Sequence, residues 1–311
     1  MNINHAMRAV EEIMSEAVNS NVTILRDASH HILAAGGKRI RPRLALLSYA
    51  ALGGEDHNAI APVAAAVELV HTASVVHDDI NDHGTIRRGR PSVNAIWGRT
   101  FALLTGDFLF TKVYELMAPY KDLNIILSEA TVALVEGETL QASAAKEGKL
   151  SREIYYDIIA LKTAALFKSA GVLGAKLAGG TQAEADALGE YGFNIGLAFQ
   201  IVDDILDLVG DSEQLGKTSG IDLAQGKGVG TVYAANGGAA TAVREEVAVA
   251  EEDDPLAAIK RKILQGDAIQ QAQDQARMLA QQAINSLEAL RPSPAKDELI
   301  ELATLVINRD H

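Results

Sequence analysis

Apolar residues recur along this chain at steps of three and four, which is the spacing of helices with one buried face. Residues 61–82 carry Val63, Val67 and Val70 at these steps. Residues 191–209 are apolar on nearly every side, as in helices at the centre of a bundle. The pattern therefore predicts two central helices over these ranges and an all-α fold.

Between residues 210 and 230 the pattern changes, because six glycines with few apolar residues form the strongest loop signal in the chain. A second, acidic break follows at residues 251–255. Neither is long enough to link two domains, and the sequence contains no repeat of solenoid length. We therefore expect residues 1–311 to form a single helical domain.

The composition supports helices and narrows the function classes. Hydrophobic residues make up 48% of the chain and aromatic residues 5%, with seven prolines, which favours long helices over a strand-rich fold. The net charge of −13 repels phosphate backbones, so nucleic acid is not an expected partner. The chain has no cysteine, which excludes disulfides and cysteine nucleophiles and fits a reducing cytoplasm.

The sequence predicts neither a secretion signal nor a transmembrane segment. Residues 1–5 lack the start of a basic, then apolar, then small-residue pattern. The longest weakly polar stretch, residues 59–76, is interrupted by Glu68 and His71 and therefore indicates a buried helix. We expect a cytoplasmic protein.

Two clusters of aspartates share one spacing, at positions i, i+1 and i+4: Asp78, Asp79 and Asp82, and then Asp203, Asp204 and Asp207. On a helix, positions i and i+4 lie on one face, a single turn apart. Carboxylates in apolar helices are costly unless cations bind them, and oxygen ligands without Cys or paired His indicate Mg²⁺. One cluster alone would equally fit a solvated helix end. Two matching clusters favour a metal site that holds a diphosphate.

Basic residues occur at several places along the chain, and some of them directly follow a carboxylate cluster. They are Lys38, Arg39, Arg41 and Arg43 after a Gly-Gly pair, Arg87, Arg88 and Arg90 after the first cluster, then Lys162, Lys217 and Lys227. Arg binds phosphate oxygens in a bidentate manner, whereas Lys supplies a compact charge. Isolated basic runs usually belong to the solvated surface. The run Arg87, Arg88 and Arg90, however, comes directly after a carboxylate cluster in a Gly-containing loop, which predicts a pocket shared by metal and diphosphate.

These motifs, taken in order, resemble those of the trans-type isoprenyl diphosphate synthases. The resemblance runs from about residue 30 to the C-terminus. It rests on Gly36-Gly37-Lys38-Arg39-Ile40-Arg41-Pro42, His71, both aspartate clusters, Arg87-Arg88-Gly89-Arg90-Pro91, Lys162-Thr163, Phe199-Gln200, Gly216-Lys217 and Asp222-Leu223-Ala224-Gln225-Gly226-Lys227. Each motif alone is common, whereas the ordered set is specific.

The resemblance implies antiparallel helices around a deep central cavity, a homodimer, and three Mg²⁺ ions per active site. The implied metal ligands are Asp78, Asp82, Asp203 and Asp207, supported by Asp79 and Asp204, and these aspartates with Arg87 and Lys162 are the implied catalytic residues. The implied contacts to the allylic diphosphate are Arg87, Lys162, Thr163, Gln200, Lys217 and Lys227. The implied contacts to isopentenyl diphosphate are Lys38, Arg41, His71 and Arg88, and Phe199 is implied to lie near the carbocation.

Some of these residues have an ordinary alternative interpretation, and the chain departs from the family pattern at two places. Without the resemblance, His71 and Phe199 would be satisfied core residues. After Lys227 the family has a Thr and a Pro that open the next helix, but here the sequence reads Gly228-Val229-Gly230-Thr231, which predicts looser loop closure. Gln141 stands where short-chain members have an acid and long-chain members tend to have Gln.

The residues before Asp78 predict the length of the product. In the family, a bulky aromatic five residues before this aspartate blocks elongation of the prenyl chain. Here Ala73 and Ser74 are small, although small residues also fit close helix packing. An aromatic floor from another helix is the alternative, with Phe101, Phe108, Phe110 and Tyr114 as candidates. We expect a hexaprenyl to decaprenyl product that passes to a membrane.

Three other functions fit parts of the pattern. A geranylgeranyl or farnesyl diphosphate synthase would differ only in product length. A class I terpene cyclase would share the first aspartate motif, but its second motif mixes Asn or Asp with Ser/Thr and Glu, and it has no need of Lys38 and Arg41. A silent subunit of a heterodimeric synthase would have lost aspartates or phosphate-binding cations, and this chain retains them.

Overall fold

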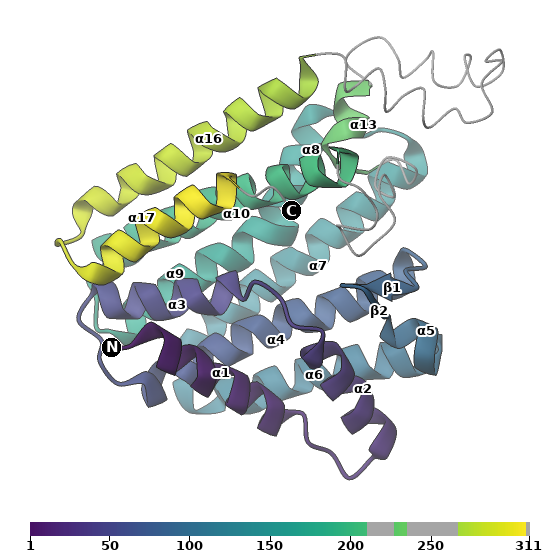
Figure 1. Ribbon diagram of the computed structural model, residues 1–311, viewed down its shortest axis with the longest axis horizontal. Helices are drawn as coiled ribbons and strands as arrows, with labels where there is room; N and C mark the ends of the chain where they lie inside the picture. The colour runs from purple at the N-terminus through teal and green to yellow at the C-terminus, as the bar shows by residue number, and fades with distance from the viewer. Residues whose placement is uncertain (210–226, 235–266, 309–311) are drawn as a thin grey trace.

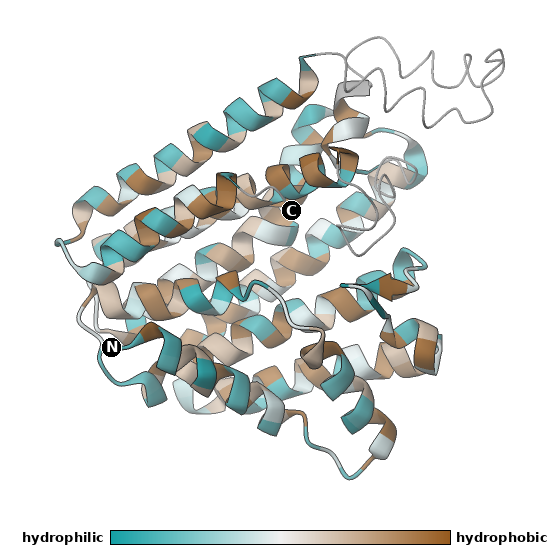
Figure 2. Cartoon of the chain, viewed as in Figure 1, coloured by the Kyte–Doolittle hydropathy of each residue, from teal (hydrophilic) through white to brown (hydrophobic). Residues whose placement is uncertain are grey.

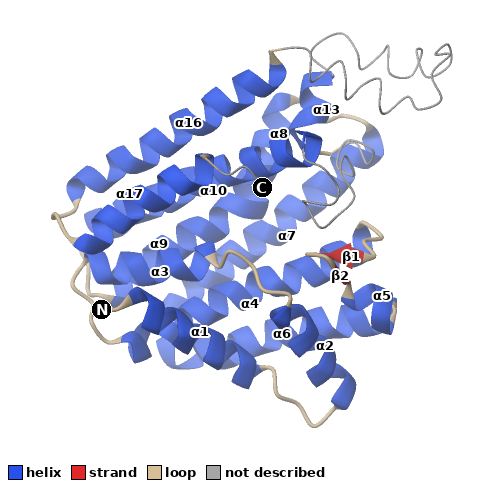
Figure 3. Ribbon diagram, viewed as in Figure 1, coloured by secondary structure: helices blue, strands red, loops and turns tan. Residues whose placement is uncertain are grey.

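The computed structural model describes residues 1–209, 227–234 and 267–308, whose helices pack side by side into one bundle (Figure 1). The described helices are α1 (Ile3–Ala17), α2 (Thr23–Ala34), α3 (Ile40–Ala51), α4 (His57–Asn81), α5 (Val93–Trp97), α6 (Arg99–Met117), α7 (Leu123–Glu147), α8 (Arg152–Ile159), α9 (Ala165–Leu177), α10 (Gln182–Val209), α13 (Gly228–Ala234), α16 (Ala268–Ser286) and α17 (Pro294–Ile307). Strands β1 (Ile86–Arg87) and β2 (Arg90–Pro91) form a short antiparallel hairpin (Figure 3). The prediction of an all-α fold is confirmed.

Local sequence sets where several helices begin and end. Asp56 caps α4, and its side chain accepts a hydrogen bond from the backbone two residues on. Ser151 caps α8 in the same manner, and Ser293 with Pro294 at the next position opens α17. Gly148 ends α7 in the left-handed conformation, at φ 64°, which glycine adopts without strain. These caps set where α4, α8 and α17 begin and where α7 ends.

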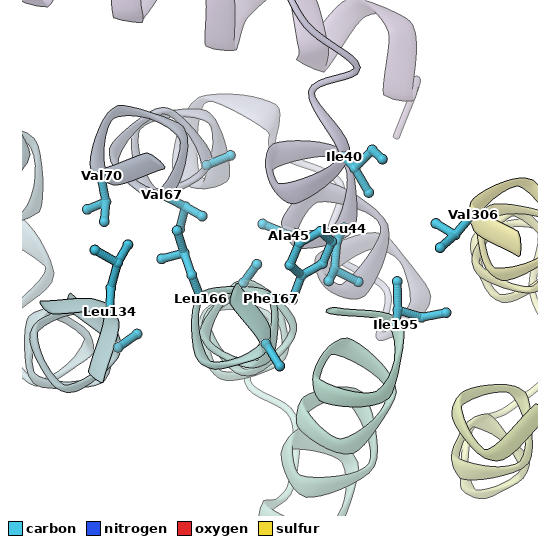
Figure 4. Close-up of a cluster of buried hydrophobic side chains, with 14 of the residues drawn as sticks. Ile40, Leu44, Ala45, Val67, Val70, Leu134, Leu166, Phe167, Ile195 and Val306 are labelled. Carbon is cyan, nitrogen blue, oxygen red and sulfur yellow. The ribbon is translucent and has the colours of Figure 1, made fainter. Parts of the chain in front are cut away.

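The two predicted central helices are the middle of the bundle. α4 packs against α1, α3 and α6, while α10 packs against α9 and α16. Figure 4 shows Val67 and Val70 of α4 beside Leu134 of α7 and Leu166 of α9. The outer helix α16 carries many hydrophilic residues on its visible face (Figure 2). Apolar side chains from helices far apart in the sequence thus form one core.

The observed boundaries extend those predicted. α4 begins a few residues before the predicted range 61–82, and α10 contains all of 191–209. Most of the predicted loop at 210–230 lies outside the described residues. The prediction that the loop continues to residue 230 was wrong, because α13 already begins at Gly228 and buries Val229 and Val232.

Two helical stretches in the described residues are long and apolar enough to cross a membrane. They are His57–Asn81 and the continuous helical run Arg152–Leu177. Most of the apolar window of each is buried inside the bundle, at 78% and 67% respectively. Their apolar character is therefore explained by packing against neighbouring helices.

Candidate active site

The first aspartate cluster lies at the C-terminal end of α4, where the chain turns into the β1–β2 hairpin. Asp78 and Asp82 are half-buried, whereas Asp79 is only 1% exposed. Arg87 of β1 donates to Asp79 Oδ1 from Nε at 2.9 Å and from Nη2 at 2.6 Å. Burial raises the pKa of Asp79, and the Arg87 charge opposes this rise. Carboxylates at a helix C-terminus are repelled by the helix dipole, so nearby cations are needed to offset this cost.

The second cluster lies near the C-terminal end of α10. Asp203 is exposed and lines the same cavity as the first cluster. Asp204 and Asp207 are buried, at 6% and 1% exposure. The two clusters therefore meet across one cavity, as their matching spacing predicts, although only Asp203 of the second cluster lines it.

The cavity between the clusters has a volume of about 210 Å³. Its lining residues are Arg41, His71, Ser74, Val75, Asp78, Asp79, Asp82, Gly84, Ile86, Arg87, Leu134, Lys162, Thr163, Leu166, Phe199, Gln200 and Asp203. A smaller space of about 80 Å³ adjoins it, lined among others by Asp82, Gln141, Tyr155, Asp204 and Lys227. Charged and apolar side chains thus line the same cavity, which suits an amphiphilic ligand.

Two lysines that were expected to bind diphosphate contact carboxylates of the first aspartate cluster in this structure. Lys162 Nζ lies 3.4 Å from Asp78 Oδ2 and 2.6 Å from Glu138 Oε1. Lys227 forms an ion pair with Asp82. Burial alone would lower the pKa of Lys162, but Asp78 and Glu138 outweigh it and raise that pKa. Burial and the neighbouring Asp78 charge raise the pKa of Glu138 to about 7.

Lys162 and Thr163 lie on a π-helical turn, Ala160–Ala164, that connects α8 to α9. Such turns occur frequently at functional sites, because they redirect side chains within a continuous helix. Gly137 of α7 packs directly against this turn: a Cβ at Gly137 would lie 2.5 Å from the Lys162 backbone nitrogen. The missing side chain lets α7 approach closely enough for Glu138 to reach Lys162.

Gly137→Ala is expected to lower turnover about tenfold or more while the chain stays folded, because the new methyl group must displace the Lys162 backbone. The measurement is steady-state turnover together with thermal unfolding. Ser143→Thr adds one methyl group at an exposed position of α7 and serves as the matched control. Equal turnover in the wild type and Gly137→Ala would contradict this role for Gly137.

Arg41 forms a second positive part of the cavity. It is 8% exposed, and its guanidinium carbon lies 4.5 Å from the Phe167 ring centroid and 5.9 Å from that of Phe199. Burial lowers the pKa of Arg41 to about 10, so it stays charged at neutral pH. Burial and the nearby arginines, Arg41 first among them, hold the pKa of His71 well below its ordinary value. His71 is therefore neutral and can donate one ring N–H to an anion.

The Gly-Gly turn before Arg41 is shaped by contacts with α4 and the hairpin. Arg39 adopts the left-handed conformation at φ 47°, and its guanidinium pairs with the buried Glu68 at 2.8 Å. Gly37, at φ 145°, lies so close to Arg88 that a Cβ would be 2.6 Å from its guanidinium. The turn thus brings the Arg88 side chain beside the start of α3.

Not every residue expected at the site lines the cavity. Lys38 and Arg88 are exposed and are not among its lining residues, Ala73 is fully buried next to Ser74, and Asp207 is buried within α10. Lys217 lies outside the described residues. Thr163 and Gln200 line the cavity and contact each other, with Thr163 Oγ1 donating to Gln200 Oε1 at 2.8 Å.

The comparison with known proteins decides the family. A model described as polyprenyl synthetase matches residues 22–259. This chain belongs to the polyprenyl synthetase family. It is 36% identical to an octaprenyl diphosphate synthase of Haemophilus influenzae, over 98% of this chain and 94% of that protein. It is also 38% identical to a short chain isoprenyl diphosphate synthase of Methanothermobacter thermautotrophicus, over the whole of both chains.

A solved structure of the family has the same fold. The polyprenyl synthase from Caulobacter crescentus, crystallised with calcium and isoprenyl diphosphate, superposes with a TM-score of 0.93 at 34% identity. The match covers 99% of this chain and 96% of that one. Members of the polyprenyl synthetase family that resemble this chain therefore include both long-chain and short-chain enzymes, so family membership alone leaves the product length open.

The donor set fits the divalent metal of the polyprenyl synthetase family. Asp78, Asp82 and Asp203 supply oxygen ligands to one cavity, and the buried Oδ2 of Asp79 has no hydrogen-bond partner among the described residues. Within the ranges that the structure describes, no three acids or histidines surround a single point closely enough to hold an ion by themselves. A divalent cation can bind through one or two carboxylates and complete its coordination with water and phosphate oxygens.

Three residues at the site were missed or undervalued by sequence reasoning. Glu138 contacts Lys162, and Gln141 accepts a hydrogen bond from Lys162 Nζ at 2.9 Å. Tyr155 donates to Asp204 Oδ2 at 2.8 Å. Glu138 could have been found, because it lies three residues before Gln141 and thus on the same helix face. Tyr155 carried no signal, since it stands among ordinary apolar and aromatic residues of α8.

Proposed function

We propose that this polyprenyl synthetase is a Mg²⁺-dependent trans-prenyltransferase that condenses isopentenyl diphosphate with an allylic diphosphate, head to tail. The observation that carries the proposal is the meeting of two carboxylate clusters and two sets of cations in one partly apolar cavity. Binding of isoprenyl diphosphate by the Caulobacter crescentus relative supports it. Three Mg²⁺ ions per active site, held by Asp78, Asp82, Asp203 and Asp207, are part of the proposal.

In this reaction the allylic C–O bond breaks, and the diphosphate leaves with the bonding electrons. Mg²⁺, when bound, neutralises charge on this leaving group. Arg87, Lys162 and Lys227 bind its oxygens, so they stabilise the same developing charge. The ion pairs that these side chains make with Asp79, Asp78 and Asp82 hold them at the diphosphate position beforehand.

Isopentenyl diphosphate is bound by Arg41, neutral His71 and the exposed Lys38 and Arg88. Its double bond attacks the allylic cation to form the new C–C bond, and the departing diphosphate takes the proton that is lost. The apolar side chains of Val75, Leu134, Leu166 and Phe199 exclude water from the cation. No protein nucleophile is required.

The test against a terpene cyclase is incubation with an allylic diphosphate and Mg²⁺ in the absence of isopentenyl diphosphate. A cyclase would release diphosphate and a hydrocarbon under these conditions. The synthase is expected to release diphosphate rapidly only when isopentenyl diphosphate is added. Rapid hydrocarbon formation from the allylic substrate alone would contradict the proposed function.

Arg41→Ala is expected to raise the KM for isopentenyl diphosphate about tenfold or more, and to change the KM for the allylic substrate much less. Lys38→Ala should act in the same direction with a smaller effect, because Lys38 is exposed outside the cavity lining. The measurement is initial velocity with each substrate varied in turn. Equal rises in both KM values would contradict the division into two diphosphate sites.

We further propose that the chain forms a homodimer through α6 and α7. Ile125, Val132 and Val135 are exposed along one face of α7, and Tyr114 of α6 lies beside it across a groove of about 260 Å³. Exposed apolar stripes of this kind mark protein interfaces.

Light scattering after size exclusion should give twice the chain mass. Val132→Glu should yield monomers, and Leu305→Glu, the same kind of change at an exposed apolar residue of α17, is the matched control. A wild-type monomer that is inactive alone would instead favour a heteromeric synthase.

The proposed product is long, from hexaprenyl to decaprenyl diphosphate, with geranylgeranyl diphosphate as the alternative. Ser74 lines the cavity with its small side chain, and Ala73 is small and fully buried beside it. The octaprenyl relative supports a long product, whereas the short chain relative supports the alternative. Passage of the product to a membrane and a cytoplasmic location of the enzyme complete the proposal.

A further inference from the structure

The Asp204 carboxylate connects three helices. Its Oδ1 accepts a hydrogen bond from Gln200 Nε2 of α10 at 2.8 Å. Its Oδ2 accepts one from the Tyr155 hydroxyl of α8 at 2.8 Å and one from the Val229 backbone N–H of α13 at 3.0 Å. Tyr155 is 3% exposed, so the hydroxyl and carboxylate meet away from bulk solvent. The Oδ1 bond lies within α10, whereas the two Oδ2 bonds connect α10 to α8 and to the start of α13.

α13 begins directly after Lys227, and contacts with α10 fix its position. A Cβ at Gly230 would lie 2.8 Å from the Leu208 side chain, so the glycine allows close packing there. The Thr231 hydroxyl donates to the Lys227 carbonyl at 2.7 Å and closes the first turn. The Gly-Val-Gly-Thr sequence that departs from the family pattern therefore forms a helix start suited to this contact.

We infer that Tyr155 and Asp204 are positioning residues that hold the start of α13 in place and thereby keep Lys227 at the diphosphate pocket. Lys227 is two residues before Val229, and its ammonium group already pairs with Asp82 at the end of α4. A shift of the Val229 backbone would move Lys227 with it. The inference rests on the proposed function for the ligand, a diphosphate, and it assigns Asp204 a role other than metal ligation.

The expected loss of diphosphate affinity follows from the free energy of one hydrogen bond, that between Tyr155 and Asp204. Removing the Tyr155 hydroxyl leaves the Asp204 carboxylate less firmly oriented toward Val229. Tyr155→Phe is therefore expected to weaken binding of inorganic diphosphate with Mg²⁺ about fivefold, measured by calorimetry. Tyr156→Phe is the matched control, because Tyr156 is the adjacent tyrosine on α8 and no hydrogen bond to Asp204 involves it among the described contacts.

A double-mutant cycle separates positioning from general damage to the fold. In a Lys227→Ala background, Tyr155→Phe is expected to cause no further loss of diphosphate affinity, because its effect is transmitted through Lys227. Equal losses in both backgrounds would overturn the inference. So would unchanged affinity in Tyr155→Phe.

Hydrogen–deuterium exchange gives a readout that does not depend on activity. Amides in residues 227–234 should exchange faster in Tyr155→Phe and in Asp204→Asn than in the wild type or Tyr156→Phe. Unchanged exchange of these amides in both variants would overturn the inference. A wild type that binds diphosphate but fails to incorporate isopentenyl diphosphate would refute the proposed function and leave the inference standing.

Discussion

Asp78→Ala and Asp203→Ala are each expected to lower turnover by about two to three orders of magnitude, with the protein still folded. The two residues lie on different helices, α4 and α10, and line the same cavity. Each is proposed to bind Mg²⁺ on the same diphosphate, so loss of either leaves the leaving group's charge poorly stabilised. The measurement is turnover at saturating substrate with Mg²⁺ varied.

A control for this prediction comes from α10. Asp186→Ala removes an exposed aspartate of α10 far along the helix from the cavity, and its turnover should equal that of the wild type. Thermal unfolding of the Asp78 and Asp203 variants should show an intact fold, and slight stabilisation is consistent with relief of carboxylate repulsion. Near-normal turnover in both variants would refute the metal assignment.

Ala73→Tyr is expected to shorten the product from the hexaprenyl–decaprenyl range toward farnesyl or geranylgeranyl length. Ala73 lies five residues before Asp78, about 7.5 Å along the α4 axis at the helical rise per residue. Ala73 is fully buried outside the cavity lining, one residue before Ser74 at the cavity wall, and the prediction is that a tyrosine at Ala73 reaches the prenyl path beside α4. The measurement is the size of the dephosphorylated products, and Ala73→Ser is the control that keeps a small side chain.

The structure also limits where an aromatic floor could come from. Phe101 and Tyr114 of α6 are exposed, whereas Phe108 and Phe110 pack partly buried against the core. None of these four aromatic residues is among those that line the cavity between the aspartate clusters. If the wild type stops at geranylgeranyl diphosphate and Ala73→Tyr changes nothing, the small residues on α4 do not set the length.

Sequence reasoning reached the central helices and the two aspartate clusters because both depend on local spacing. Apolar periodicity predicts α4 and α10 directly, and a carboxylate pair at i and i+4 predicts a shared face without knowledge of the partner helix. The resemblance placed Arg41, Lys162 and Gln200, and the structure brings all three to the cavity.

The remaining features depend on contacts between segments that are distant in sequence. The π-helical turn at Lys162 lies where Gly137 of α7 approaches closely. The sequence of residues 160–164 alone does not predict this turn. Tyr155 gains its role only because Asp204 lies opposite it on α10. Such pairings could not be predicted from either segment alone.

The most direct test of the proposed function is incubation of the purified chain with labelled isopentenyl diphosphate, Mg²⁺ and farnesyl diphosphate, followed by sizing of the dephosphorylated products. We predict incorporation of label into all-trans polyprenols of six to ten isoprene units, abolished by a metal chelator. Products of four units would retain the prenyltransferase and contradict the long-chain proposal. Failure to incorporate label with farnesyl, geranyl or dimethylallyl diphosphate as primer would contradict the central claim.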